Sequence, residues 1–287
     1  MTEITASLVQ SLRIKTGVGM MDCKKALTEA NGDLELACDL LRKKGLSKAH
    51  NKNDRVTYEG VIAFAINDHN VALVELQSET DFVAKNEKFV NLATEIADIA
   101  VKTLATTELL TASILPNGKV ISDAINENIM VLGENIRLGK VGYLSVKKGI
   151  VQSYIHNAIS NRCGKIGVAI AIESDTDIID KTALNELAKQ ISMHIAATNP
   201  ESLNIESLDP IRIEKEKTIC AEQAKASGKP EAVIEKMIEG RMRKFYDEVV
   251  LEEQPCIMVP DKKIKDLVKE LGGQLKIVGY LRFSVNN

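Results

Sequence analysis

The chain has 287 residues, of which 45% are hydrophobic and 27% are charged, a composition typical of a globular protein with about two domains. Its formal net charge is −3, so the chain as a whole offers no basic surface for phosphate groups. Aromatic residues make up only 3% and tryptophan is absent, which argues against a platform on which nucleic-acid bases stack. We therefore expect no direct binding to nucleic acid.

The sequence shows no pattern of secretion or membrane insertion. The opening MTEITASLVQ contains an acidic residue and no apolar core, unlike a signal peptide. The apolar runs, such as VAIAI at 168–172, are too short to span a bilayer. The five cysteines are odd in number and form no CxxC pair, as is typical of reduced thiols. We expect a cytoplasmic protein that makes no contact with a membrane.

Residues 1–46 predict three short helices, with Thr5 as N-cap of the first and Asp33 as N-cap of the third. A glycine that ends the helix follows each of them, at Gly17, Gly32 and Gly45. Together they predict a compact three-helix module. The polar, aperiodic residues 47–58 then predict a linker.

A unit that starts with a charged residue, a glycine and an apolar strand occurs twice, at 59–101 and 148–198. Each copy predicts a β-hairpin, an acidic junction and a long helix. The first helix carries apolar residues at helical spacing, namely Phe89, Leu92, Ala93, Ile96 and Ile99. The second does so with Leu184, Leu187, Ile191 and Ile195. This duplication predicts an α+β fold with helices packed on a sheet.

The junction in the first copy, ETDFVAKN at 79–86, holds one of only five phenylalanines of the chain. One interpretation is that Phe82 turns inward and staples the start of the following helix. The other is that Phe82 enters a pocket on a partner. The second copy has SDTD, without an aromatic residue, at the matching place, and this mismatch favours the partner interpretation.

The remaining segments predict further elements in order. Residues 122–136 favour a helix and 137–147 a strand, and a helical hairpin follows at 209–250. Asp209 is the expected N-cap of the hairpin and Pro210 its first helical residue. The tail predicts a short helix at 262–272 and a strand at 275–285.

Two short patterns suggest nucleotide binding but lack the rest of such a site. NKND at 51–54 matches a guanine-reading pattern, which by itself is weak and fits a solvated linker better. The segment GENIRLGKV at 133–141 has the wrong glycine spacing for a phosphate loop, and Val141 stands where a magnesium-binding hydroxyl is needed. We therefore expect no nucleotide site in this chain.

Other reactive side chains also fail to form a convincing site. The four histidines, His50, His69, His156 and His194, lack the spacing of a zinc site. A nucleophilic pair of His156 and Cys163 is conceivable, but no third member accompanies it. Glu79 and Asp81 fit a solvated loop better than an acid–base pair. We expect no catalytic residue, no metal and no cofactor.

Seven segments in order resemble bacterial elongation factor Ts, the guanine-nucleotide exchange factor for elongation factor Tu, and the resemblance covers essentially the whole chain. The segments are TGVGMMDCKKALTEANGDLELA (16–37), TDFVAKN (80–86), LGENI (132–136), MHIAATNP (193–200), SGKP (227–230), EKMIEGRMRKF (235–245) and QPCIMVP (254–260). In one departure, the second hairpin is longer than is usual in the family, and Asn157 stands where glycine is common.

The resemblance implies a ubiquitin-associated-like N-terminal module that contacts the GTPase domain of elongation factor Tu, and a core that inserts Asp81 and Phe82 beside its magnesium and phosphate site. It implies that contacts to elongation factor Tu come from Met20, Met21, Thr80, Asp81, Phe82, Val83, Leu132 and His156. In some members the helical hairpin is a dimerisation element, so a homodimer through 209–248 is left open.

The patterns and the resemblance together divide the chain into five parts. We expect an N-terminal three-helix module with linker at 1–55, a first core subdomain at 56–146, a second at 147–208 completed by 249–262 and the C-terminal strand, an inserted helical hairpin at 209–248, and a C-terminal helix–strand module at 263–287. Two other classes compete with an exchange factor. The first is a GTPase or hydrolase, and the second is a scaffold that binds partners through residues 1–46 alone.

Overall fold

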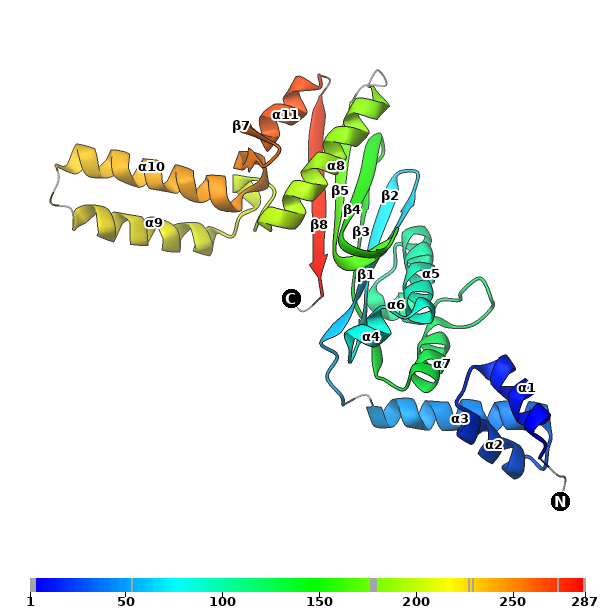
Figure 1. The fold of residues 1–287 in the computed structure, drawn as a ribbon. Helices are drawn as coiled ribbons and strands as arrows, with labels where there is room; N and C mark the ends of the chain where they lie inside the picture. The colour runs from blue at the N-terminus through cyan, green and yellow to red at the C-terminus, as the bar shows by residue number, and fades with distance from the viewer. Residues whose placement is uncertain are drawn as a thin grey trace.

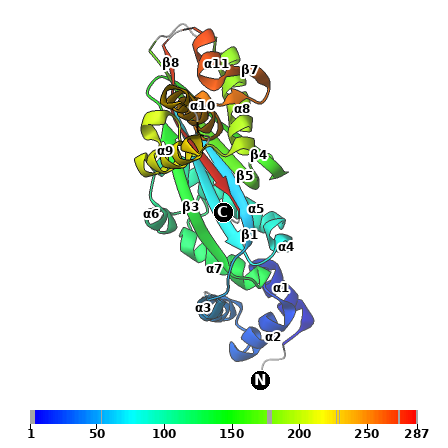
Figure 2. The ribbon, with the colours of Figure 1, turned by 90° about the vertical axis from the view of Figure 1, so that its left-hand side faces the viewer.

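The computed structural model describes residues 4–52, 54–175, 180–226, 228, 230–272 and 274–285, and side chains are not described for 46–52. The predicted α+β class is confirmed, because helices pack on a sheet whose paired strands are antiparallel. The junction SDTD of the second copy falls partly on 176–179, outside the described residues. In Figures 1 and 2 the N-terminal helices and the helical hairpin lie toward opposite ends of the sheet.

The N-terminal module consists of α1 (Ala6–Thr16), α2 (Met20–Glu29) and α3 (Leu34–Lys52). The hydroxyl of Thr5 accepts a hydrogen bond from the Leu8 N–H (3.3 Å), as expected of an N-cap. Gly17 ends α1 with a φ of 68°, a left-handed conformation that glycine adopts without strain. The three helices enclose a small core formed by Val9, Leu12, Val18, Cys23, Ala26, Leu27, Ala30, Ala37 and Leu41.

The prediction that Gly45 ends the third helix is wrong, since α3 continues to Lys52. Gly45 is buried and packs against α7 (Ile121–Leu132), where a Cβ atom on it would lie only 2.4 Å from the sulfur of Met130. Glycine therefore serves here to let two helices approach closely. The predicted linker is correspondingly shorter, because residues 47–52 are helical.

Both predicted hairpins are present and join in one six-stranded sheet. The strands are β1 (Glu59–Asn67), β2 (Asn70–Ser78), β3 (Ile136–Ser145), β4 (Gly149–Ser160), β5 (Cys163–Ser174) and β8 (Leu275–Ser284). Their order is β3-β2-β1-β5-β4, and β8 also pairs with β5. The two copies meet in a short register in which Ile62 pairs with Gly164 and Ala63 with Cys163.

This sheet folds so that the two hairpins face each other across an apolar layer. A Cβ atom on Gly167 of β5 would lie 2.4 Å from the Ile62 side chain of β1, so the layers are in close contact there. Buried side chains from both hairpins, together with Val146 after β3, fill the layer. The hairpin residues are Ile62, Val71, Leu73, Val151, Ala169 and Ala171. The helices α5 (Glu87–Thr103) and α8 (Lys181–Thr198) each cover the other face of their own hairpin (Figure 1). Their predicted apolar stripes are buried, except that Ile99 is half-buried.

The remaining elements follow the predicted order. The hairpin is α9 (Pro210–Lys225) and α10 (Glu231–Val249), and Asp209 caps it by accepting a hydrogen bond from the Ile211 N–H (2.9 Å). Its inner face packs in cis around Cys220, Met242 and Phe245. The other short elements are α4 (Asp81–Ala84), α6 (Thr107–Thr111), two 3-10 turns (Ile205–Ser207 and Leu251–Glu253), β6 (Pro255–Cys256), β7 (Val259–Lys263) and α11 (Ile264–Glu270). The boundaries between the five expected parts stay a prediction.

Candidate partner-binding site

The junction at 79–86 connects β2 to α5, and we call these eight residues the ledge. Its centre is α4, a single helical turn. Val83 and Ala84 on this turn are buried in the core of the first copy, whereas Phe82 is 83% exposed. Phe82 therefore contributes little to that core, and the interpretation that it staples the helix start is wrong. The ledge presents an aromatic ring to solvent.

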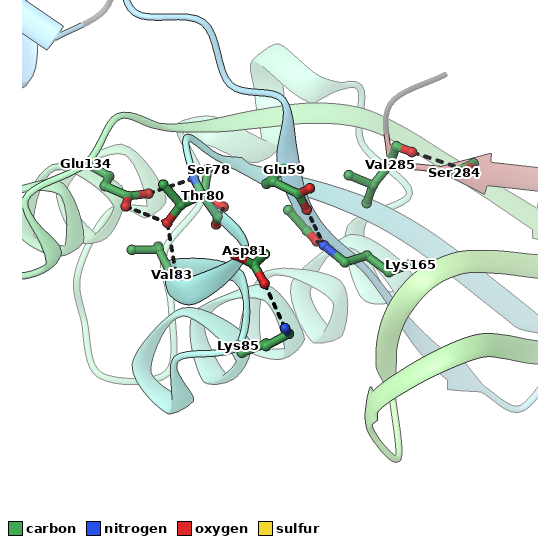
Figure 3. Close-up of polar contacts among 11 residues, drawn as sticks. Glu59, Ser78, Thr80, Asp81, Val83, Lys85, Glu134, Lys165, Ser284 and Val285 are labelled. Atoms are coloured by element: carbon green, nitrogen blue, oxygen red, sulfur yellow. Dashed lines mark hydrogen bonds and ion pairs between the residues drawn. The ribbon is translucent and has the colours of Figure 1, made fainter.

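Thr80 caps this turn and holds it against a distant segment. Its hydroxyl accepts a hydrogen bond from the Val83 N–H (3.4 Å) and donates one to Oε1 of Glu134 (2.6 Å). The Thr80 N–H donates to Oε2 of the same carboxylate (3.0 Å). Figure 3 shows Glu134 reaching Thr80 from the segment that follows α7. The start of α4 is thus fixed by a charged acceptor.

Asp81 lies half-exposed beside Phe82 and pairs with Lys85, one turn later, at 2.7 Å (Figure 3). The hydrogen bond from Lys85 lowers the pKa of Asp81, and the same bond raises the pKa of Lys85. The free protein therefore presents an ionised carboxylate with a cation next to it. Glu79 does not join Asp81, because its carboxylate accepts a hydrogen bond from the Asn135 N–H (2.6 Å). The acid–base alternative has no support in this geometry.

The other predicted contact residues lie on other elements. Met20 and Met21 begin α2 and are 56% and 68% exposed, which is unusual for large apolar side chains. Leu132 is the last residue of α7 and packs, half-buried, against the core of the first copy. His156 lies exposed on β4, with Nδ1 3.1 Å from the Tyr154 hydroxyl. Residues 80–83 are thus gathered at α4 and the two methionines on α2, whereas Leu132 and His156 lie on separate elements.

The geometry of the second hairpin also decides whether His156 and Cys163 can form a nucleophilic pair. Cys163 is fully buried, and burial raises the pKa of its thiol to about 11, so it is protonated at neutral pH. In the β4–β5 register His156 pairs with Ile166, not with Cys163. A Cys–His pair is therefore wrong. Asn157 adopts a left-handed φ of 52°, a conformation that glycine and asparagine adopt more readily than other residues.

Among the described residues, no part of the fold offers a phosphate loop, a metal site or a membrane span. Residues 136–141 lie in β3, so the glycines of 133–141 do not lead into a helix. Asn53 of the NKND pattern is outside the described residues. No group of three or more potential metal ligands gathers in the described part of the chain. In that same part, every helix is too short or too polar to cross a bilayer.

The sequence reasoning missed two residues of the site, Glu134 and Lys85. Lys85 had a usable signal, because it stands four residues after Asp81 on a helical turn. Glu134 lies inside the LGENI segment, but nothing local connects it with Thr80, from which it is 54 residues away in the chain.

Comparison with known proteins places this chain among the translation elongation factors. The sequence model of the family described as Elongation factor TS matches residues 79–287. The chain is 47% identical to Elongation factor Ts of Rhizobium rhizogenes over 98% of this chain and 92% of that protein. It is 47% identical to that of Caulobacter vibrioides (99% and 93%) and 45% to that of Gluconobacter oxydans (99% and 93%). The chain belongs to the elongation factor Ts family.

Proposed function

We propose that this protein is a guanine-nucleotide exchange factor that binds elongation factor Tu in its GDP form and promotes GDP release during translation elongation. Membership of the family supports this proposal. The observation that carries it is Phe82, an aromatic side chain 83% exposed on a turn that is itself anchored in the core. An exposed ring on a fixed turn is suited to enter a pocket with little loss of conformational entropy.

In this proposal Phe82 enters an apolar pocket of the GTPase, and Asp81 disturbs the polar shell around its magnesium and phosphates. Magnesium is often the largest local charge at a phosphate site, so displacing its ligands is an effective way to weaken the nucleotide. The coupling is reciprocal: the factor weakens GDP binding, and GDP weakens binding of the factor. The protein then needs no covalent chemistry, and we assign it no catalytic residue.

Phe82 alone is too small to account for exchange. A thousandfold faster release requires about 4 kcal/mol, whereas burying one phenylalanine contributes roughly 1.5–3 kcal/mol. Further contacts must hold the ledge in place. We assign these to Met20 and Met21 on the N-terminal module and to Leu132 and His156 on the core. The cytoplasm, where translation takes place, is the location that this function implies.

The test is release of a fluorescent GDP analogue from purified elongation factor Tu. We expect the parent protein to accelerate release strongly. We expect Phe82→Ala to reduce that acceleration by about 10- to 100-fold, since it removes roughly 1.5–3 kcal/mol of burial in the complex. Leu109→Ala is the matched control, because Leu109 is also exposed but lies on α6. No acceleration by the parent would exclude exchange, and undiminished acceleration by Phe82→Ala would remove Phe82 from the mechanism.

Two alternatives make different predictions. A scaffold that binds through residues 1–46 alone would keep its full affinity for elongation factor Tu when Phe82 is truncated. A GTPase or hydrolase would bind nucleotide by itself, so saturable binding of fluorescent GDP to this chain at micromolar concentration would favour it. Neither alternative gives a role to the exposed ring.

Homodimerisation through the helical hairpin stays a separate prediction. The inner face of the hairpin is used in cis, so a dimer would have to use its outer apolar residues, such as Ile211, which is 79% exposed, and Val233. Sedimentation velocity at increasing concentration tests this. A dimer that dissociates in Ile211→Glu would support the prediction, and a monomer throughout would refute it.

A further inference from the structure

Two segments that are far apart in the sequence bind each other through reciprocal carboxylate contacts. Glu134 accepts hydrogen bonds from the N–H and the hydroxyl of Thr80, and Glu79 accepts one from the N–H of Asn135. We call these four residues the carboxylate clamp. Asn135 is fully buried, and its side-chain amide donates to the Arg55 carbonyl (2.8 Å), which ties the clamp to the segment before β1.

We propose that Glu134 is a positioning residue for exchange: it orients α4 so that Asp81 and Phe82 point at the partner. This inference rests on the proposed function and deepens it. Glu134 itself does not need to touch elongation factor Tu, because it acts through Thr80.

The reason is that α4 cannot hold its own direction. It has four residues, and a helix of one turn is unstable in isolation. Its inner side is anchored by Val83 and Ala84, but this leaves the start of the turn to be fixed by Thr80. The Thr80 hydroxyl has a single hydrogen. Because that hydrogen is directed to Glu134, the oxygen lone pairs are free to accept from the Val83 N–H. A charged acceptor makes this arrangement stronger than a neutral one would.

The helix that precedes Glu134 is also held firmly in place. Glu134 follows directly after Gly133, which caps α7 with a φ of 82°. The buried face of α7 packs on the core of the first copy, while Met130 and Val131 pack on the N-terminal module. Arg42 of α3 also pairs with Asp123 of α7 at 2.7 Å. The Glu134 carboxylate therefore lies just beyond the end of a helix that is held on two sides, and its contacts with Thr80 fix the start of α4.

The first experiment measures the position of the turn without any exchange activity. The chain has no tryptophan, so Phe82→Trp places a single tryptophan at the tip of the turn. In this background we expect Glu134→Gln to lower the steady-state fluorescence anisotropy. The substitution replaces one of the two carboxylate oxygens, each of which accepts from one Thr80 donor, with an NH2 group that cannot accept. The matched control is Glu127→Gln, an exposed carboxylate on α7 that pairs with Lys119. Equal anisotropy for both variants would overturn the proposal.

The second experiment separates positioning from general stability. We expect Glu134→Gln to lower the maximal rate of GDP release (kcat) by on the order of 10-fold, as for loss of a charge-assisted hydrogen bond. The apparent KM for elongation factor Tu should change by less than about threefold, because the contacts of the N-terminal module remain. Circular dichroism of each variant checks that the fold is retained.

The decisive comparison is in a background that carries both Asp81→Ala and Phe82→Ala, because Glu134 is proposed to position both side chains. If Glu134 acts through the exposed turn, Glu134→Gln there should slow release by less than about twofold further, since interacting residues are not additive. A full 10-fold further loss would show that Glu134 acts elsewhere and would refute the proposal. Failure of the proposed function is distinguishable, because then the parent protein itself does not accelerate release.

Discussion

The two copies of the hairpin–helix unit share the order of their elements but differ in what their helices bury. Both helices end on a residue in the left-handed conformation, Leu104 in the first copy and Asn199 in the second, each with a φ of 49°. The buried residues of α5 are all apolar, whereas α8 also buries Ser192 and His194. His194 binds the segment that follows the helical hairpin, because its Nε2 lies 2.8 Å from Oε1 of Gln254.

This difference shows that the two copies hold different segments of the chain in place. In the first copy α5 is held by apolar contacts, and polar contacts at the ledge around Thr80 and Asp81 fix the start of α4. The second copy uses a buried polar group to fasten the tail of the chain. Duplication therefore supplied one scaffold twice, and each copy came to hold a different additional segment in place.

The largest expected effect contrasts two phenylalanines of the first copy. Phe89 on α5 is fully buried, so Phe89→Ala should lower the free energy of unfolding by about 3–5 kcal/mol. Phe82→Ala, seven residues earlier, should change it by less than about 0.5 kcal/mol, because its ring is exposed. Urea denaturation followed by circular dichroism measures both. Similar losses in the two variants would contradict the assignment of one ring to the core and the other to a partner.

The next effect tests what the copies share. Gly60 is the second residue of β1 and Gly149 the first residue of β4, and both have positive φ values, 152° and 130°. A Cβ atom would lie 2.3 Å from the Leu76 carbonyl oxygen in the first case and 2.0 Å from the Ile172 carbonyl oxygen in the second. Gly60→Ala and Gly149→Ala should each cost on the order of 3 kcal/mol, from backbone strain and overpacking.

Gly240→Ala is the control for this pair, since no heavy atom lies within 4 Å of a Cβ there. That change lies inside α10 and should raise stability by up to about 1 kcal/mol, because alanine favours helix more than glycine does. If only one strand glycine proved sensitive, the two copies would not share their starting geometry.

The third prediction concerns the pH dependence of stability, and it involves a residue of the second copy only. Burial lowers the pKa of His194, although the Gln254 hydrogen bond opposes this. The Ile257 N–H donates to Nδ1 (3.3 Å), so this nitrogen carries no proton in the native state. Below about pH 6.5, His194 binds a proton in the unfolded chain more readily than in the native state. The free energy of unfolding should therefore fall as the pH falls through that value. Above it, the contribution is fully present.

Denaturation at pH 7.5 and pH 5.5 measures this effect. His194→Asn should lose roughly 1–3 kcal/mol at pH 7.5, because Gln254 and the Ile257 N–H lose their buried partner, but its stability should depend less on pH than that of the parent. His156→Asn, which alters an exposed histidine, should keep the pH dependence of the parent. An unchanged pH dependence in His194→Asn would show that other groups cause it.

Local features of the fold could be predicted from the sequence, and contacts between distant segments could not. The caps at Thr5 and Asp209 followed from residue type, because a cap satisfies backbone groups two or three positions away. Gly45 was misinterpreted, since a glycine that ends a helix and one that admits a neighbouring helix have the same sequence signature. Only Met130, 85 residues later, distinguishes them.

In the candidate site, too, local features could be predicted from the sequence and contacts between distant segments could not. That Phe82 is an unusual residue for a polar junction was visible in the sequence, and its exposure agrees with the partner interpretation. The carboxylate clamp was not visible, because the contact of Glu134 with Thr80 exists only after α7 has packed on the core and on the N-terminal module. The folding of the sheet on itself could not be predicted either, since each hairpin pattern predicts only its own pair of strands.

The smallest expected effect concerns the ion pair that joins the two copies. Arg162, in the turn between β4 and β5, donates two hydrogen bonds to Asp98 of α5, at 2.6 and 3.0 Å. This contact raises the pKa of Arg162. Both side chains are about 40% exposed, so solvent screens much of the attraction. Arg162→Gln should therefore cost only about 0.5–1 kcal/mol.

A double-mutant cycle with Asp98→Asn isolates this pair, and its coupling energy should fall when sodium chloride is raised from 0.05 to about 1 M. The backbone remains as an internal control, because the Phe64 N–H donates to the Arg162 carbonyl (3.1 Å) whatever side chain stands there. A salt-independent coupling of several kcal/mol would mean that the ion pair, and not the shared apolar layer, holds the two copies together. A weak, salt-sensitive coupling leaves that role to the side chains of the layer itself, such as Ile62 and Ala169, which are fully buried between the hairpins.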